Sequence, residues 1–375
     1  MNRRSRSVRQ QAIRLGLGAI LGLALLARSA WADVTVAVVG PMSGDLASVG
    51  EQLRRGADAA VQEINAKGGL LGQKVTLITR DDLCDDKKAA VIAEELSAQR
   101  VALVDGHLCS GASIAASTIY RVHHILEITP SSTNPVFTDR GFPNVFRTCG
   151  RDDLQGFVAA EHIIRNFRGR KIAIIRDPTV YSRGLTEITK GYLNHQGIDE
   201  AFVQDIAARQ TDFSTVLDRI KREDVRLVFF TSYVPEATAF LRQADAAGVH
   251  FRMLAGDTLM NSDFLKQAGR LADGVEITFP PDPADDRRNE ALTHWFGDHG
   301  YKPEAFTFYS FAAVQIWAQA VAKSNSFEMA AVASALHSGT FSSVLGSVRF
   351  DAKGDISAPG FVVYVFDRGK VYYLD

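Results

Sequence analysis

Short apolar runs rich in Val, Ile and Leu recur along the chain, with mixed polar and apolar stretches between them. The first four runs are residues 34–40, 74–82, 100–106 and 124–130. Apolar residues occupy successive positions in these runs, as expected for strands that are covered on both faces of a sheet. The runs therefore predict four buried β-strands.

The stretches between these runs have the period of an amphipathic helix. Leu53, Ala57 and Ile64 fall on one helical face. The glycine pair at 68–69 predicts where that helix ends. Residues 85–99 repeat the pattern after the second run. Strands that alternate with helices predict a parallel sheet with helices on both faces.

A second series of strand-like runs predicts a second α/β unit. These runs are residues 171–177, 226–232, 251–257 and 274–280. The apolar helical stretch 305–324 needs a sheet to cover, which suggests that the chain returns to the first unit. Near the C-terminus, residues 367–369 are typical of a hairpin turn.

The predicted fold class is α/β, with two doubly wound parallel-sheet lobes joined by short crossovers. We expect lobe 1 to comprise residues 33–153 and 282–359, and lobe 2 to comprise residues 154–281 and 360–375. Ligands of open parallel sheets bind at the carboxyl ends of the strands, so the residues that follow the strands are the candidates for a site between the lobes.

The first residues have the parts of a secretory signal. Five arginines before position 15 precede an apolar stretch, residues 15–27, and Ala30 and Ala32 form a small-x-small cleavage pattern. The apolar stretch is short for a membrane span, although a membrane anchor is the alternative. We expect a signal peptide of residues 1–32, cleavage after Ala32 by either export route, and a mature protein in the periplasm without direct membrane insertion.

The net charge of the chain argues against some classes of binding partner. The predicted signal peptide carries six arginines and no acidic residue, so its removal takes the formal net charge from −1 to about −7. A chain this acidic is not expected to bind nucleic acid or anionic lipid.

Three cysteines remain after cleavage, and an oxidising compartment favours a disulfide between two of them. Cys84 follows the second predicted strand and Cys109 follows the third. We treat these strands as neighbours whose carboxyl ends lie close together, so Cys84 and Cys109 are the expected pair. Cys149 is then left as a small, half-buried thiol.

The segment Gly106–Ser113 combines several reactive side chains, and three chemistries compete for it. A nucleophile at Ser110 would need His107 as its base, but no G-x-S-x-G elbow surrounds the serine. Zinc would need a second pair of ligands beside His107 and Cys109, and the nearby aspartates are expected to be solvated: Asp81, Asp82, Asp85 and Asp86. We therefore expect no enzyme activity, no metal and no cofactor.

A ligand site explains this segment better. Ser110 lies where a strand gives way to a helix, so a hydroxyl, backbone N–H groups and the positive end of the helix converge there. The next strand ends in a similar segment with Ser131, Ser132 and Thr133. Ordinary turns and caps are the alternative, but two such ends side by side suit a carboxylate.

Several motifs together resemble the branched-chain amino-acid (Leu/Ile/Val) periplasmic binding proteins of ABC transporters, which have the class I periplasmic-binding (Venus-flytrap) fold. Their order and spacing match along almost the whole mature chain: VAVVGPMSG, INAKGGLLG, DDLCDD, GHLCS, ITPSSTNP, RTCGRDDLQG, DFSTVLDRIKRED and VRFDAKGD. The resemblance implies a monomeric solute-binding protein that closes two lobes around an amino acid and delivers it to a membrane permease.

The resemblance also assigns roles to single residues. It supports the disulfide Cys84–Cys109 independently. It implies that the ligand carboxylate is bound by the Ser110 and Thr133 side chains and by the backbone at Ser131. The implied contacts from lobe 2 are Tyr181, Tyr233 and, for the ligand ammonium, Asp257.

This sequence departs from the family pattern at three places, which leaves the ligand side chain open. Val49 stands where family members often have an aromatic residue, whereas Phe306 still supplies an aromatic side chain to the wall of the implied pocket. Asp257 stands where Glu is common, and Ser131 and Ser132 replace smaller apolar residues. Other ligands of the same fold (an aromatic acid, an amide or urea) and a sensory role are the alternatives.

Overall fold

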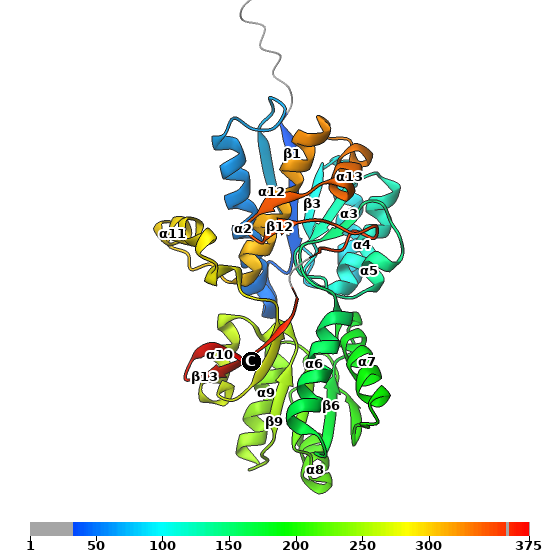
Figure 1. Cartoon of the computed structure of the whole chain (residues 1–375), viewed down its shortest axis with the longest axis vertical. Helices are drawn as coiled ribbons and strands as arrows, with labels where there is room; N and C mark the ends of the chain where they lie inside the picture. Colours follow the sequence, from blue (N-terminus) through cyan, green and yellow to red (C-terminus); the bar gives the residue numbers. More distant parts are fainter. Residues whose placement is uncertain (1–32, 358–359, 375) are drawn as a thin grey trace, which may run out of the picture. The chain divides into compact units, whose positions relative to one another are not determined.

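The computed structural model describes residues 33–357 and 360–374, so the predicted signal peptide lies outside the described residues. Their strands form two large sheets and a two-stranded one (Figure 1). We use lobe 1 for the first large sheet with its helices and lobe 2 for the second. Among the described residues, no helix has the length and apolar character of a membrane span.

The sheet of lobe 1 is entirely parallel, with the strand order β2-β1-β3-β4-β5. Its strands are β1 (Val34–Gly40), β2 (Val75–Asp81), β3 (Leu103–Gly106), β4 (Leu126–Thr129) and β5 (Val145–Arg147). Its longer helices are α2 (Ala47–Ala66), α3 (Asp86–Ala98), α4 (Ser110–Val122), α12 (Ala305–Ser324) and α13 (Met329–Ser338).

Helix α12 confirms that the chain returns to the first unit, because it packs along α2 and against β3 and β4. Gly56 makes this close approach possible: a Cβ atom there would lie 2.1 Å from the carbonyl oxygen of Thr307. The short elements of lobe 1 and of the connections are η1 (Gly44–Leu46), α5 (Val136–Asp139), η4 (Pro283–Asp285), η5 (Arg287–Asn289), α11 (Glu290–Asp298), β11 (Phe341–Ser343) and β12 (Gly346–Val348).

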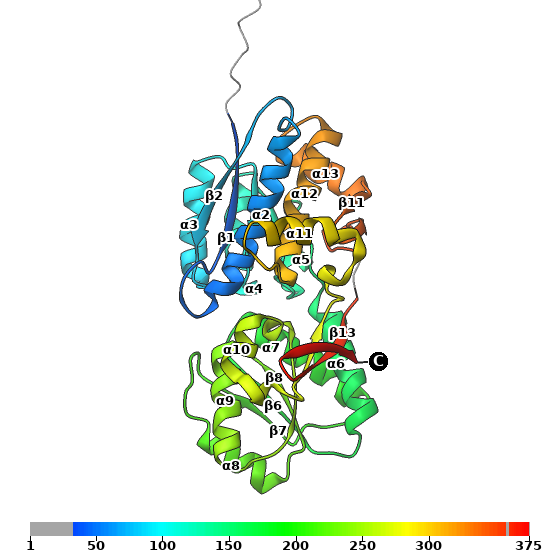
Figure 2. The ribbon, with the colours of Figure 1, turned by 90° about the vertical axis from the view of Figure 1, so that its left-hand side faces the viewer.

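The sheet of lobe 2 has the order β14-β13-β10-β9-β8-β6-β7. Figure 2 labels its strands β6, β7, β8 and β13. Its strands are β6 (Ile172–Arg176), β7 (Phe202–Asp205), β8 (Leu227–Thr231), β9 (Arg252–Ala255), β10 (Glu276–Phe279), β13 (Val362–Asp367) and β14 (Lys370–Leu374). Its helices are α6 (Asp152–Phe167), α7 (Val180–His195), α8 (Ser214–Glu223), α9 (Val234–Ala246), η2 (Asp257–Leu259), α10 (Ser262–Ala268) and η3 (Gly269–Ala272).

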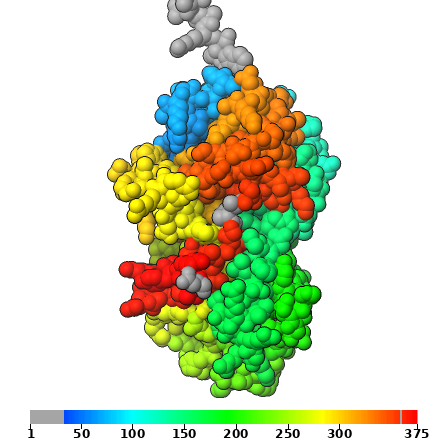
Figure 3. Space-filling view, viewed as in Figure 1, coloured from blue at the N-terminus to red at the C-terminus, as the bar shows by residue number. Residues whose placement is uncertain are grey.

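The predicted C-terminal hairpin is confirmed: β13 and β14 are antiparallel, with Asp367 opposite Lys370. This hairpin extends the sheet of lobe 2, because β13 also pairs with β10. In the space-filling view the late orange segments cover lobe 1, whereas the red hairpin lies on lobe 2 (Figure 3). The lobe boundaries given by residue number stay a prediction.

All eight predicted strands are present, but one inference about their order is wrong. β2 and β3 are not neighbours, because β1 lies between them and pairs with both. Strands β5 and β7 were not predicted at all.

Candidate functional site

One cavity collects most of the predicted site residues. The empty space between its lining atoms is about 410 Å³, a volume that includes open solvent at its mouth. Its lining comes from both lobes: Leu46, Val49, Leu108, Cys109, Ser110, Ser131 and Phe306 from lobe 1, and Tyr181, Tyr233, Asp257 and Thr258 from lobe 2. Seven of the eight predicted ligand residues therefore line one space.

The eighth, Thr133, is buried beside this lining rather than part of it. Its carbonyl oxygen accepts a hydrogen bond from the N–H of Asp152 at 3.0 Å. The next N–H along the chain, that of Asn134, lies 3.4 Å from the Ser110 hydroxyl, which it uses as acceptor. Ser110 thus keeps its own proton for another partner.

The backbone N–H groups at the end of β4 are almost all used within the protein. The Thr129 hydroxyl oxygen accepts from the N–H of Ser131 at 3.2 Å and of Ser132 at 2.9 Å. Within residues 33–357 and 360–374, the Thr133 N–H has no hydrogen-bond acceptor, whereas the buried Thr133 hydroxyl interacts with the Asp152 carboxylate. The backbone N–H of Thr133 therefore remains unsatisfied.

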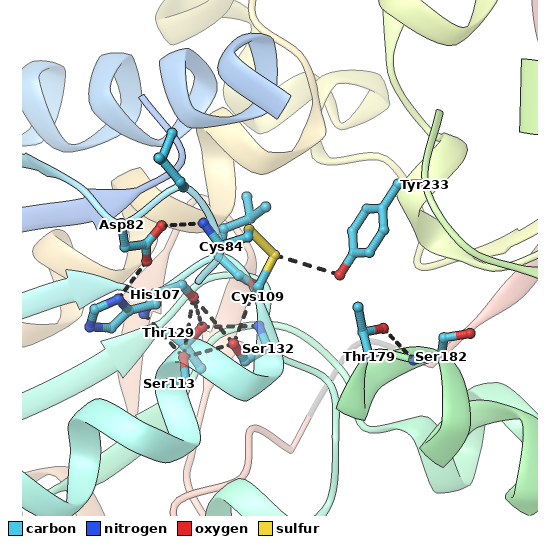
Figure 4. The surroundings of a disulfide bond; sticks show 12 residues. Asp82, Cys84, His107, Cys109, Ser113, Thr129, Ser132, Thr179, Ser182 and Tyr233 are labelled. Carbon is cyan, nitrogen blue, oxygen red and sulfur yellow. Dashed lines mark hydrogen bonds and ion pairs between the residues drawn. A yellow bond between two sulfur atoms is a disulfide. The ribbon is translucent and has the colours of Figure 1, made fainter. Parts of the chain in front are cut away.

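A buried polar network fixes the segment that follows β4 (Figure 4). The carbonyl oxygen of His107 accepts from the hydroxyls of Thr129 at 2.7 Å and Ser132 at 3.2 Å. The His107 ring lies 2.6 Å from an Asp82 carboxylate oxygen and 3.2 Å from the Tyr120 hydroxyl. His107 is therefore a buried structural residue, whereas the expectation that Asp82 is solvated is wrong, because its side chain is completely buried.

The predicted disulfide Cys84–Cys109 is present, with Cα atoms 5.4 Å apart. Since β1 separates the two strands, the bond spans the carboxyl end of β1 and ties the start of α4 to the β2–α3 connection. The Cys109 sulfur lies 3.5 Å from the Tyr233 hydroxyl of lobe 2 (Figure 4). Cys149 is a free thiol, as predicted, but fully buried rather than half-buried, and burial raises its pKa.

Lobe 2 contributes an acidic residue to the cavity. One Asp257 carboxylate oxygen accepts from the Tyr181 hydroxyl at 2.7 Å and from the Gln155 amide at 3.0 Å. Gly256 leaves room for this arrangement, because a Cβ atom there would lie 2.2 Å from the Tyr181 hydroxyl oxygen. Burial raises the pKa of Asp257, and the two hydrogen bonds oppose that rise. A nearby cation would favour the ionised form further.

Apolar side chains form the remaining wall. Leu46, Val49 and Leu108 face the cavity with Phe306, whose ring meets Phe279 edge to face with centroids 5.6 Å apart. The site thus offers hydrogen-bond donors from lobe 1, a buried carboxylate from lobe 2 and an apolar wall. These groups suit a small zwitterion with an apolar side chain. No cluster of three or more potential metal ligands occurs in the described part of the chain.

Sequence reasoning missed Leu46, Leu108, Thr258 and Gln155. Leu108 lies inside the GHLCS motif and Gln155 inside RTCGRDDLQG, so both motifs contain a usable signal. Leu46 and Thr258 belong to short 3₁₀ turns that follow strands. Ligands bind at the carboxyl ends of parallel strands, but this rule does not say which residue of such a turn contacts the ligand.

Comparisons with known proteins agree with this geometry. The family model for periplasmic binding proteins matches residues 33–370. The Leu/Ile/Val-binding protein homolog 1 of Brucella abortus (strain 2308) is 41% identical over 342 residues, which cover 91% of this chain and 92% of that protein.

Solved structures extend the comparison. An ABC transporter substrate-binding protein from Desulfitobacterium hafniense, in complex with Leu, is 26% identical with a TM-score of 0.75, covering 91% of this chain and all of that one. The leucine binding protein LivK from Thermotoga maritima has a TM-score of 0.83 at 24% identity, with 91% and 98% coverage. The predicted fold of two parallel-sheet lobes is confirmed.

Proposed function

The chain belongs to the periplasmic binding protein family, and we propose that it binds a branched-chain α-amino acid between its two lobes and delivers it to the membrane permease of an ABC importer. The observation that carries this proposal is the free N–H of Thr133 beside a cavity whose lining includes Ser110 and the buried acid Asp257. The protein makes and breaks no bond of its ligand.

The ligand carboxylate belongs at the lobe 1 end. There the Thr133 N–H and the Ser110 hydroxyl supply donors, and the positive end of α4 begins at Ser110. Hydrogen bonds to a charged acceptor are the stronger kind, so these groups favour an anion over a neutral amide.

The ligand ammonium belongs at Asp257. A buried carboxylate is costly unless a cation accompanies it, and within the described residues Asp257 has hydrogen-bond donors but no positively charged partner. Tyr181 and Gln155 occupy one of its oxygens, which leaves the other for the ligand. A ligand without an amine would leave this acid uncompensated, which argues against plain aromatic acids.

The ligand side chain belongs against the apolar wall. Val49 is smaller than the aromatic residue common in relatives, and Phe306 closes the wall opposite. The relative from Brucella is named for binding Leu, Ile and Val, and the one from D. hafniense was solved with Leu, which supports an aliphatic side chain here.

Ligand binding would favour the closed arrangement of the lobes. The carboxylate contacts lie in lobe 1, whereas Tyr181, Tyr233 and Asp257 lie in lobe 2. A ligand that touches both gains contacts only when the lobes approach, so it shifts the population toward the closed form. We propose that this closed, periplasmic monomer is what the permease recognises.

A thermal-shift panel tests the proposal. Protein stripped of ligand is heated with each of the twenty amino acids, with D-leucine, and with benzoate, an amide and urea. We expect the largest increases in Tm with L-Leu, L-Ile and L-Val, and none with D-leucine. A response to benzoate or urea alone would instead support the other ligand classes, and no response to any amino acid would refute the proposal.

A further inference from the structure

Arg147 is the last residue of β5 and is completely buried beneath the loop that ends β4. Its guanidinium donates to the carbonyl oxygens of Ser132 at 2.5 Å and Asn134 at 3.1 Å. It also donates to the Thr138 hydroxyl at 2.8 Å and lies 2.6 Å from a carboxylate oxygen of Asp355. One side chain therefore clamps two carbonyl groups that flank Thr133.

We propose that Arg147 is a positioning residue that aims the Thr133 N–H at the ligand carboxylate. In a trans peptide the C=O and N–H of one unit point in opposite directions. The Ser132–Thr133 unit is trans, so holding the Ser132 carbonyl against Arg147 turns the Thr133 N–H the other way, toward Ser110 and the cavity. The inference rests on the proposed function.

The neighbouring peptide units do not compete for this role. Thr129 already accepts the N–H groups of Ser131 and Ser132, and Pro135 has no N–H to present. Among the donors at the end of β4, the Thr133 N–H is therefore the one that Arg147 orients and the protein leaves unused. A guanidinium on the carbonyl oxygen also polarises the peptide, which strengthens its N–H as a donor.

The charge of Arg147 is balanced inside the protein, so the ligand is not needed to neutralise it. Asp355 lies between Arg147 and Arg151, whose guanidinium is 2.7 Å from its second oxygen. Asp355 belongs to the VRFDAKGD motif and Arg147 to RTCGRDDLQG, so two motifs far apart in sequence meet behind the carboxylate end of the site.

Arg151 supplies a matched control. It contacts the same Thr138 hydroxyl at 3.0 Å and the same Asp355 carboxylate, but among the described residues it donates to no carbonyl of residues 131–134. Arg151→Lys therefore disturbs the ion cluster without releasing the loop, whereas Arg147→Lys keeps the charge and loses the two-carbonyl clamp.

The test measures affinity by calorimetry at pH 7 with two probes, L-leucine and isoamylamine, which has the same side chain and ammonium but no carboxylate. For Arg147→Lys we expect the Kd of L-leucine to rise about 10- to 50-fold and that of isoamylamine by less than about threefold. For Arg151→Lys both values should stay within about threefold of wild type.

Equal losses for both probes, or no loss for either, would overturn the positioning role. If Arg147→Lys does not fold, the double variant Arg147→Gln/Asp355→Asn removes both buried charges together and should show the same split between probes. Wild-type protein that binds no L-leucine would overturn the proposed function and this inference with it. If wild-type protein binds L-leucine and Arg147→Lys keeps the full preference for L-leucine over isoamylamine, only the positioning role is refuted.

Discussion

The two walls of the cavity differ in the kind of polar group that they carry. On the lobe 1 side the donors are a backbone N–H and small hydroxyls, fixed by a buried network that includes Thr129, His107 and Arg147. On the lobe 2 side the contacts are long side chains, with Tyr181 and Gln155 holding Asp257. In the proposed function, anion binding is therefore spread over several fixed donors, whereas cation binding depends on one carboxylate. Removing one side chain should cost more on the lobe 2 side.

The largest effect is expected when that carboxylate is removed. Asp257→Ala should weaken amino-acid binding at least about 100-fold, roughly 3 kcal/mol, because the ligand ammonium loses its only proposed counter-ion. Calorimetry with L-leucine measures the change. Asp263→Ala, which removes an acid paired with Lys266 on the neighbouring α10, is the matched control. Affinity of Asp257→Ala within twofold of wild type would show that the ammonium lies elsewhere.

Breaking the disulfide tests the rigidity of the lobe 1 wall. In a background of Cys149→Ala, the double variant Cys84→Ala/Cys109→Ala should lower the free energy of unfolding by about 3 kcal/mol. Urea denaturation measures this loss, and the Cys149→Ala parent is the control. Binding should weaken as well, since Cys109 precedes Ser110 at the start of α4. An unchanged affinity would mean that the hydrogen-bond network alone fixes this wall.

Asp152 lies where the two walls meet, and its charge state should make stability depend on pH. Burial and the nearby charge of Asp257 raise its pKa to about 8, and a hydrogen bond from the Thr133 hydroxyl opposes that rise. Between about pH 4 and pH 8 the unfolded chain has lost this proton and the folded protein retains it. The contribution of Asp152 to stability therefore falls as pH rises across that window.

Asp152→Asn mimics the neutral acid, so it should remove this fall. We expect the ligand-free variant to be about 1 to 2 kcal/mol more stable than wild type at pH 8 and little changed at pH 4. Urea denaturation at both pH values tests this, with the half-exposed Asp153→Asn as control. Equal differences from wild type at the two pH values would refute an ionisation effect.

The smallest expected effect is the removal of one hydroxyl from the lobe 1 wall. Ser110→Ala should weaken L-leucine binding about tenfold, because the Thr133 N–H remains. The control is Thr118→Ala, on the exposed side of α4. If Ser110→Ala cost more than Asp257→Ala in the same calorimetric assay, the proposed contrast between the walls would be reversed.

Most of the fold follows from local patterns, and the exceptions have physical causes. Long apolar runs identified eight strands, because strands that are covered on both faces of a sheet consist mostly of apolar residues. β5 has only three residues, and β7 is partly exposed, so neither produces such a run. The order of the strands depends on tertiary packing, which is why β1 between β2 and β3 was not anticipated.

The site residues, like the strands, were predicted only in part from local sequence patterns. The position of Ser110 and Ser131 at strand ends identified the lobe 1 wall, whereas Tyr181, Tyr233 and Asp257 came only from family resemblance. Asp82 was misjudged because it belongs to a run of acids that looks solvated in sequence, yet it is buried against His107. Gln155 acts on Asp257 across 102 positions of sequence, a distance over which no local pattern carries information.

The chain passes between the lobes more than once, with α12 returning to lobe 1 and the β13–β14 hairpin ending in lobe 2. These crossings between the lobes have a consequence for biosynthesis. A nascent polypeptide that has reached residue 300 already carries Tyr181, Tyr233 and Asp257, but lacks the helix that faces α2 and the strand that borders β10. Neither lobe therefore has all of its packing partners until the last segments of the chain have been made.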